Sequence, residues 1–406
     1  MTQTVRRRRV LYIPGFDPFH PRRYRELYRK EGAAQAAISG YELSQAKGDG
    51  PYSWDVSARM DGVTVETGIE VLVWSDIVSE SMSNSIPATY AQLARTAWTY
   101  IGSGALFRLM RLRQGPVIAA LYPVVFLLAQ LVGAVLMGAL AAWGLTAALS
   151  PVLAGFPTTV AILAGLLGIA VGIALLRWFK ARDAKVFAYY LMHDYAFSAR
   201  LRGANPPELE ARMAAFGETI AAAAASDVDE VLVVGHSSGA HLAVSVLADL
   251  IRAGRVPNDR VAFLSLGQVV PMVSFLPDAH RLRADLNLMG GQDLIPWVDV
   301  TAPGDGCAFA LCDPVAVSGV APAVQRWPLV ISAAFTQTLS PERWNALKRR
   351  YFRLHFQYLC AFDRPGDYDY FRITAGPMTL DARFAGRAPS PSRLTAAVNR
   401  FTAMAA

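Results

Sequence analysis

Residues 231–243 read VLVVGHSSGAHLA, and this stretch decides the fold. Its first four residues are apolar and mostly β-branched, which is typical of a strand buried on both faces. From Ser238 to about residue 253 the spacing of apolar residues is that of a helix. Between the two, Gly235, Ser237 and Gly239 form a G-x-S-x-G pattern. A strand, a sharp turn and a helix in this order predict a unit of an α/β protein.

Further strands and helices alternate on both sides of this stretch. Apolar runs predict strands at 10–13, 69–74, 261–266 and 296–300. Alternating residues around Asp61-Gly62 predict a β-hairpin within 52–68. Helices are expected at 20–38, 84–112, 183–203, 207–225 and 238–253. Because apolar strands separated by helices are typical of parallel sheets, we expect a mostly parallel α/β sheet flanked by helices.

The composition is more apolar than that of an average soluble enzyme. Of the 406 residues, 53% are hydrophobic and 17% are charged, whereas soluble domains have roughly 45–50% and about 25%. The excess is concentrated, since no Asp, Glu, Lys, Arg or His occurs between Arg113 and Arg177. A bilayer crossing needs about 20 apolar residues, so this segment has room for two, at about 117–139 and about 159–177.

The connection and the small residues of this segment fit a helical hairpin. Residues 150–159 contain the Ser, Pro and Gly that a short turn requires. Glycines allow two helices to approach closely in lipid, and five are available: Gly133, Gly138, Gly165, Gly168 and Gly172. We therefore predict a two-helix transmembrane hairpin at 114–177, inserted before the strand at 231–234.

Basic residues at both ends orient the predicted hairpin. The first span is preceded by Arg108, Arg111 and Arg113, and the second is followed by Arg177, Lys180, Arg182 and Lys185. Because positive residues favour the cytoplasmic side, both termini are expected in the cytosol. Residues 1–113 and 178–406 then form one cytoplasmic domain. We expect an integral protein of the bacterial inner-membrane type, whose first partner is the lipid bilayer.

Other bulk properties exclude several classes of partner. The net charge is +7, but its densest run, 6–9, leads directly into a strand and does not form a basic face with interleaved aromatic residues. No nucleic-acid partner is expected. Three cysteines are too few for a disulfide framework, and Cys307 and Cys312 lack a second ligand pair for zinc. We expect no metal and no cofactor, and the oligomeric state is left open.

The G-x-S-x-G stretch carries the expected chemistry. A glycine-flanked serine between a strand and a helix is typical of a nucleophile elbow, which holds Ser237 at the tip of a strained turn. The backbone N–H of Ser238 lies at the start of the helix, where an oxyanion would form. Ser237 is therefore the predicted nucleophile, and Ser238 is a predicted donor of the oxyanion hole.

On these residues the chain resembles the α/β-hydrolase superfamily, especially its lipases and esterases. The similarity covers about 1–76 and 205–375. By this resemblance, the segment 10–18, VLYIPGFDP, looks like the early strand and loop that supply the second oxyanion N–H. The resemblance implies that Phe16 is that donor, with Gly15 permitting close approach.

The chain order of the family is nucleophile, acid, histidine. Six aspartates follow the nucleophile and are candidates for the acid: Asp278, Asp285, Asp293, Asp299, Asp305 and Asp313. Asp305 is favoured because it lies in the loop after the strand at 297–301, with Asp299 and Asp313 as alternatives. His355 is the one histidine that follows these three, and so is the expected base. Its surroundings read as helical, whereas the family base follows the last strand, which is either 328–335 or 370–374.

These expectations predict a membrane-anchored serine hydrolase. It would cleave an acyl ester, of a lipid-like substrate, through Ser237, His355 and Asp305 and an acyl-enzyme intermediate. The alternative is a catalytically silent hydrolase-fold protein that acts as a scaffold or regulator at the membrane.

Overall fold

The computed structural model describes residues 4–82, 85–183, 186–257 and 260–405. The predicted flanking residue Lys185 lies outside these ranges. The chain divides into two compact units. The first unit comprises 1–80, 99–117 and 201–406, and the second comprises 81–98 and 118–200.

The first unit is built on an eight-stranded sheet with the order β2-β3-β4-β1-β5-β6-β7-β8. Its strands are β1 (Arg7–Ile13), β2 (Glu42–Lys47), β3 (Ser53–Met60), β4 (Val63–Val71), β5 (Glu230–His236), β6 (Val261–Leu266), β7 (Trp297–Thr301) and β8 (Leu329–Ser332). β4, β1, β5, β6, β7 and β8 pair in parallel, and β2 and β3 join by antiparallel pairing. The predicted mostly parallel α/β sheet is confirmed.

The order of the strands places a switch point between β1 and β5. The chain builds β2, β3 and β4 on one side of β1 and then returns to add β5 to β8 on the other side. In open parallel sheets, sites lie outside the carboxyl ends of the strands at such a point. The loops after β1, β5, β6 and β7 all leave from this edge.

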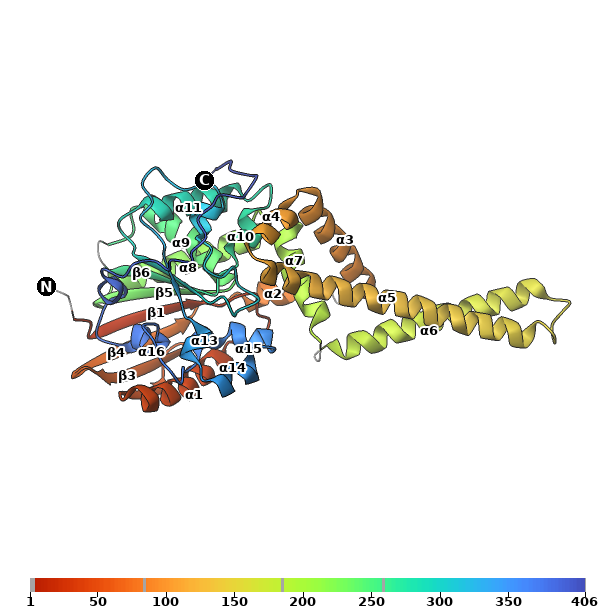
Figure 1. Cartoon of the computed structure of the whole chain (residues 1–406), viewed down its shortest axis with the longest axis horizontal. Coiled ribbons are helices and arrows are strands. Elements are labelled where there is room, and N and C mark those ends of the chain that lie inside the picture. Colours follow the sequence, from red (N-terminus) through yellow and green to blue (C-terminus); the bar gives the residue numbers. More distant parts are fainter. Residues whose placement is uncertain (1–3, 83–84, 184–185, 258–259, 406) are drawn as a thin grey trace. The chain divides into compact units, whose positions relative to one another are not determined.

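Helices cover both faces of the sheet (Figure 1). One face carries α8 (Pro207–Ala225), α9 (Gly239–Arg252) and α11 (His280–Gly291). The other face carries α1 (Arg22–Ser39), α16 (Tyr370–Ala375) and α17 (Leu380–Phe384). The first unit also contains α4 (Ala105–Leu112), α10 (Val270–Ser274), α12 (Pro314–Val317), α13 (Phe335–Thr338), α14 (Pro341–Leu347), α15 (Tyr351–His355) and the 3-10 turn η2 (Gln357–Leu359).

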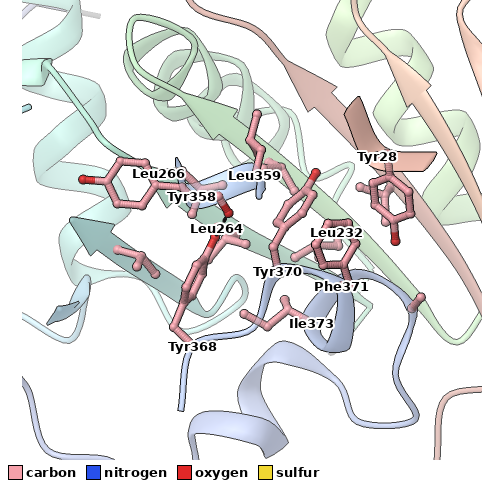
Figure 2. Close-up of a cluster of buried hydrophobic side chains, with 14 of the residues drawn as sticks. Tyr28, Leu232, Leu264, Leu266, Tyr358, Leu359, Tyr368, Tyr370, Phe371 and Ile373 are labelled. Carbon is pink, nitrogen blue, oxygen red and sulfur yellow. Dashed lines mark hydrogen bonds between the residues drawn. The ribbon is translucent and has the colours of Figure 1, made fainter. Parts of the chain in front are cut away.

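An aromatic core fills the space between the sheet and the helices of the second face. Figure 2 shows Tyr28 of α1 against Phe371 of α16, and the two ring centres are 4.9 Å apart in an edge-on arrangement. Tyr368 donates a hydrogen bond of 2.6 Å to the carbonyl oxygen of Tyr358 (Figure 2). Because buried rings contribute large apolar areas, this core rigidly supports Tyr358, which recurs in the candidate site.

The second unit contains two long apolar helices, α5 (Gln114–Leu149) and α6 (Pro157–Ala181), together with α7 (Ala188–Arg200). Two further helices, α2 (Ser75–Ser81) and α3 (Ile86–Gly102), run across the division between the units, and α5 begins in the first unit. Both α5 and α6 are long and apolar enough to cross a membrane. In the most apolar 18-residue window of each helix, 22% is buried in α5 and 11% in α6.

Glycines bring α5 and α6 into close contact. A Cβ atom on Gly138 would lie 2.5 Å from the carbonyl oxygen of Gly168, and one on Gly168 would lie 2.7 Å from that of Gly138. A Cβ on Gly172 would lie 3.4 Å from Ala134. The predicted role of the glycines therefore holds for Gly138, Gly168 and Gly172. It is wrong for Gly133 and Gly165, which have open space beside them.

Several predicted elements are corrected. The strand expected at 69–74 is the end of β4, which begins at Val63 directly after the Asp61-Gly62 turn. β2 was not predicted, because an edge strand with mostly exposed polar residues lacks an apolar pattern. Of the two candidates for the last strand, 328–335 contains β8, and 370–374 lies in α16.

Candidate functional site

Ser237 occupies a strained turn between β5 and α9. Its φ is +56°, in the left-handed region that costs an L-residue about 1–2 kcal/mol. Its backbone N–H donates to the carbonyl oxygen of Leu266, 2.9 Å away, which ties the turn to the end of β6. The side chain is part-exposed, unlike its neighbours on both sides. Local strain of this kind is concentrated at functional sites.

Both motif glycines are required by backbone contacts. A Cβ on Gly235 would lie 2.8 Å from the Cα of Ala240, inside the turn. A Cβ on Gly239 would clash with the carbonyl oxygen of Ile13 and would lie 2.6 Å from that of Pro14. Because backbone atoms cannot move aside as side chains do, the serine turn packs directly on the end of β1.

The loop after β1 reaches Ser237. A Cβ on Gly15 would lie 2.9 Å from the Cβ of Ser237 and 3.3 Å from its hydroxyl oxygen. Phe16, the predicted oxyanion donor, follows directly, and its buried ring lies edge-on against Trp74 at 6.1 Å. Ser238 precedes the first residue of α9, so its N–H is one of the unsatisfied donors at a helix start. The two predicted donors therefore lie in segments that flank Ser237.

Asp305 and His355 are in contact. Nδ1 of His355 lies 2.7 Å from Oδ2 of Asp305, although the residues are 50 positions apart. Asp305 is in the loop after β7, and His355 is the last residue of α15. The Asp305 side chain is fully buried, and the His355 side chain is 7% exposed.

Hydrogen bonds keep Asp305 ionised. Burial by itself would raise the pKa of Asp305, but the charge and hydrogen bond of His355, together with two further hydrogen bonds, lower it, and the net shift is downward. Two more donors contribute: the backbone N–H of Cys307 at 2.9 Å and the hydroxyl of Tyr358 at 3.0 Å. Burial, together with the Asp305 charge, raises the pKa of Tyr358 well above its usual value, so this phenol remains a donor.

The other predicted candidates for the acid have different partners. Asp299 lies within β7 and accepts a hydrogen bond of 2.5 Å from the hydroxyl of Ser265. Burial raises the pKa of Asp299 to about 8. Asp313 caps α12, where it accepts from the backbone N–H groups of Val315 and Ala316. Among these three aspartates, the structure brings Asp305 to His355.

His236 supports the backbone of the candidate base. Its Nε2 lies 3.1 Å from the carbonyl oxygen of His355, and the two rings are 4.9 Å apart. Burial, with a smaller effect from His355, lowers the pKa of His236 to about 3. The ring is therefore neutral at neutral pH. Since a carbonyl oxygen only accepts, Nε2 of His236 carries the hydrogen.

Three residues of this site were not predicted: His236, Gly267 and Tyr358. Gly267 follows β6 with φ of +54°, and a Cβ there would lie 2.7 Å from the Tyr358 ring and 3.1 Å from Cε1 of His355. A glycine immediately after a buried strand was a usable signal for Gly267. Nothing in the sequence indicated the contacts of His236 and Tyr358, because they depend on how α15 and η2 return to the sheet.

The serine and the histidine are not hydrogen-bonded to each other. Within the described ranges, the Ser237 hydroxyl and Nε2 of His355 have no hydrogen-bond partner. Nδ1 of His355 is engaged by Asp305, so Nε2 is the nitrogen left to react. Such contacts are often long in unliganded sites and tighten when the substrate binds.

A metal does not fit this arrangement. Donor atoms of Asp305, Cys307 and His355 lie within 4.8 Å of one another. However, the 2.7 Å between Asp305 and His355 is a hydrogen-bond distance. Two ligands on a tetrahedral zinc, at about 2.0–2.2 Å from the metal, are roughly 3.3 Å apart. The geometry is that of an oriented histidine.

No protein-family model, curated protein or solved structure matches the chain.

Proposed function

We propose that the protein is a membrane-anchored serine hydrolase of the esterase or lipase type, similar to the α/β-hydrolase superfamily. The observation that carries this proposal is the strained Ser237 between β5 and α9, at the same sheet edge as the buried Asp305–His355 pair. A parallel sheet can arrange a nucleophile, an acid and a base in this way because their loops leave its carboxyl edge together.

The proposed reaction is acyl transfer. The Ser237 hydroxyl attacks the carbonyl carbon of an ester while Nε2 of His355 takes its proton. Asp305 holds the hydrogen on Nδ1 and stabilises the imidazolium that forms. His355 then protonates the leaving alcohol as the C–O bond breaks, which leaves an acyl-serine. Water, deprotonated by His355, hydrolyses this intermediate and releases the carboxylic acid.

The oxyanion would be bound by backbone donors. The N–H of Ser238 has the positive end of the 14-residue helix α9 behind it. The loop 14–16, pressed against Ser237 at Gly15, supplies the N–H of Phe16 as the second donor. Removal of one oxyanion donor typically costs about 10²–10³-fold in rate.

The two apolar helices support the membrane part of the proposal. Their outward-facing surfaces are apolar, and the basic residues beside them favour a cytoplasmic location for both ends. An ester that partitions into the bilayer is then the substrate class within reach of a tethered site.

A fluorophosphonate probe tests the nucleophile. The purified full-length protein should be labelled in detergent micelles, and Ser237→Ala should not. Ser238→Ala is the matched control, because it removes the neighbouring hydroxyl and keeps the backbone N–H. Absence of labelling, or equal labelling of Ser237→Ala, would refute the proposal.

One observation favours a silent scaffold as the second candidate. The Ser237 hydroxyl has no hydrogen bond to a described residue, so the serine is not yet paired with its base. Labelling rates of the wild type and of His355→Ala distinguish the two. A hydrolase should lose several orders of magnitude, whereas a scaffold would show equal, slow labelling.

A further inference from the structure

Six successive exposed residues precede the candidate base: Lys348, Arg349, Arg350, Tyr351, Phe352 and Arg353. Four of them are cations, two are aromatic, and none is acidic. We call residues 348–353 the basic-aromatic segment. Its first three residues link α14 to α15, its last three begin α15, and it ends two residues before His355.

The described residues offer no counter-ion to the charges of this segment. In the part of the chain that the structure describes, none of its four cations forms an ion pair. Arginines elsewhere in the same unit behave differently: Arg8 pairs with Glu230, and Arg212 pairs with Asp76. Four unpaired like charges within six residues leave a strong positive potential for an external anionic surface.

The aromatic residues indicate which kind of anionic surface fits. Tyr351 is 58% exposed and Phe352 is 36% exposed. Aromatic rings next to clustered Lys and Arg are typical of segments at the headgroup level of a bilayer, where the rings enter the interface and the cations contact anionic lipids.

Contacts within the first unit place the segment beside the start of α5. A Cβ on Gly306 would lie 3.1 Å from the ring of Tyr351. Gly306 is also close to α5, because a Cβ on Gly115 would lie 3.4 Å from the Cα of Gly306. Gly115 belongs to the first turn of α5, and the predicted span begins at about 117. The segment therefore adjoins the point at which the chain would enter the membrane.

Helix α4 has a second apolar and basic surface next to the same point. Its Leu109 and Leu112 are buried, whereas Phe107 is 57% exposed and Met110 and Arg111 are exposed. The helix ends at Leu112, and α5 begins two residues later. Chain connectivity alone therefore keeps these residues close to a lipid surface.

We propose that the basic-aromatic segment, assisted by the exposed face of α4, binds the headgroup layer of an anionic leaflet. This inference rests on the membrane insertion in the proposed function. It adds that the loop of Asp305 and the helix of His355 lie at the lipid surface, so that an acyl lipid enters the site directly from the leaflet. A nucleic acid is the less favoured partner, because the predicted span already brings lipid within one helical turn of Gly115.

Chemical footprinting of lysine tests the contact. The full-length protein is placed in nanodiscs of phosphatidylcholine alone or of phosphatidylcholine with phosphatidylglycerol, and acetylation of Lys348 is compared with that of exposed Lys30 in the same unit. In the anionic discs the relative reactivity of Lys348 should fall about five-fold, the factor expected for one cation near an anionic surface. High salt should restore it, since screening shortens the reach of the charges.

Matched variants distinguish an effect of the basic-aromatic segment from a general effect of positive charge. Arg349→Gln/Arg350→Gln/Arg353→Gln should abolish the lipid-dependent protection. The control also removes three positive charges, by Arg6→Gln/Lys47→Gln/Arg59→Gln. These residues are exposed and lie in strands of the sheet or next to them. The control should keep the lipid-dependent protection of Lys348. Equal Lys348 reactivity in both kinds of disc would overturn the proposal, and so would protection by polyuridylic acid without protection by anionic lipid.

Failure of the docking and failure of the proposed function give different results. If the fluorophosphonate probe labels Ser237 in the discs while Lys348 is unprotected, the docking is wrong and the hydrolase proposal stands. If Lys348 is protected and Ser237 is unlabelled, the docking stands and the hydrolase proposal fails. Release of the protein from membranes by alkaline carbonate would refute the insertion, on which the docking rests.

Discussion

Replacement of Asp305 by Asn should convert His355 into the wrong tautomer. Oδ2 of Asp305 accepts from Nδ1 of His355 and from the Tyr358 hydroxyl, and Oδ1 accepts from the N–H of Cys307. The amide oxygen of the introduced side chain can occupy only one of these positions. Because the Cys307 N–H cannot become an acceptor, the amide oxygen is expected to remain on it.

The NH₂ group of the introduced amide then faces His355 and Tyr358. The phenol can rotate to accept, and the imidazole can accept only if Nδ1 gives up its hydrogen. The hydrogen then moves to Nε2, the nitrogen that must take the proton from Ser237. A histidine held in this tautomer loses about 10⁴-fold in kcat, which corresponds to about 5 kcal/mol of barrier.

The assay is hydrolysis of a short-chain ester by the protein in detergent micelles, with the rate of fluorophosphonate labelling as a second readout. Asp299→Asn and Asp313→Asn are the controls, since both aspartates are buried in the same unit and neither contacts His355. The hydrolysis rates of these two variants should stay within about ten-fold of the wild-type rate. The melting temperature of each variant shows whether it folds.

A different ranking would refute this reasoning. If Asp305→Asn retains activity within ten-fold while Asp299→Asn or Asp313→Asn loses it, the acid has been assigned to the wrong residue. If all three variants hydrolyse the ester like the wild type, His355 does not depend on an aspartate at all.

Three other predictions concern stability, and each is checked by thermal unfolding in detergent. Gly239→Ala should destabilise the protein by several kcal/mol, because its Cβ would clash with backbone oxygens of Ile13 and Pro14, whereas Gly217→Ala, with its nearest neighbour at 3.8 Å, should be neutral or stabilising. Arg8→Met should cost about 3–5 kcal/mol, because it leaves buried Glu230 without its partner; an unchanged melting temperature would contradict this. Burial raises the pKa of Asp299 from 3.8 to about 8, so the unfolded state loses a proton that the folded state keeps, and this group's contribution to stability falls as the pH rises from about 4 to about 8. Asp299→Asn should therefore raise the melting temperature more at pH 8 than at pH 5. The gain in the free energy of unfolding at pH 8 has an upper limit of about 5 kcal/mol. An equal effect at both pH values would show that Asp299 is ionised in the fold.

Much of the fold is local and could be read from residue patterns. β5 and α9 occur where the apolar run and the helical spacing predicted them, and α8 has the predicted bounds. The Asp61-Gly62 turn was predictable because a two-residue hairpin needs positive φ at both positions. The pattern of apolar residues did not predict β2, because its exposed polar residues take part in the sheet through backbone hydrogen bonds.

The candidate site was predictable in parts. Ser237 could be found because the strain of the turn requires glycines nearby in the sequence, at Gly235 and Gly239. The residue that acts as the acid could not be chosen among three aspartates, since a carboxylate after a strand also serves as a helix cap, as Asp313 does. His355 followed only from the chain order of a family, and its contact with Asp305 had no local signal.

The sequence by itself determined the alternation of strands and helices, the glycine-flanked serine turn and the two apolar helices, because each depends on residues within one or two turns of chain. Only the tertiary structure decided that Asp305 meets His355, that His236 donates to the carbonyl oxygen of His355, and that the basic-aromatic segment adjoins the start of α5. These contacts join segments from about 50 to more than 100 residues apart. Their geometry is the joint result of sheet order, aromatic packing and loop closure, and no single stretch of the chain encodes it.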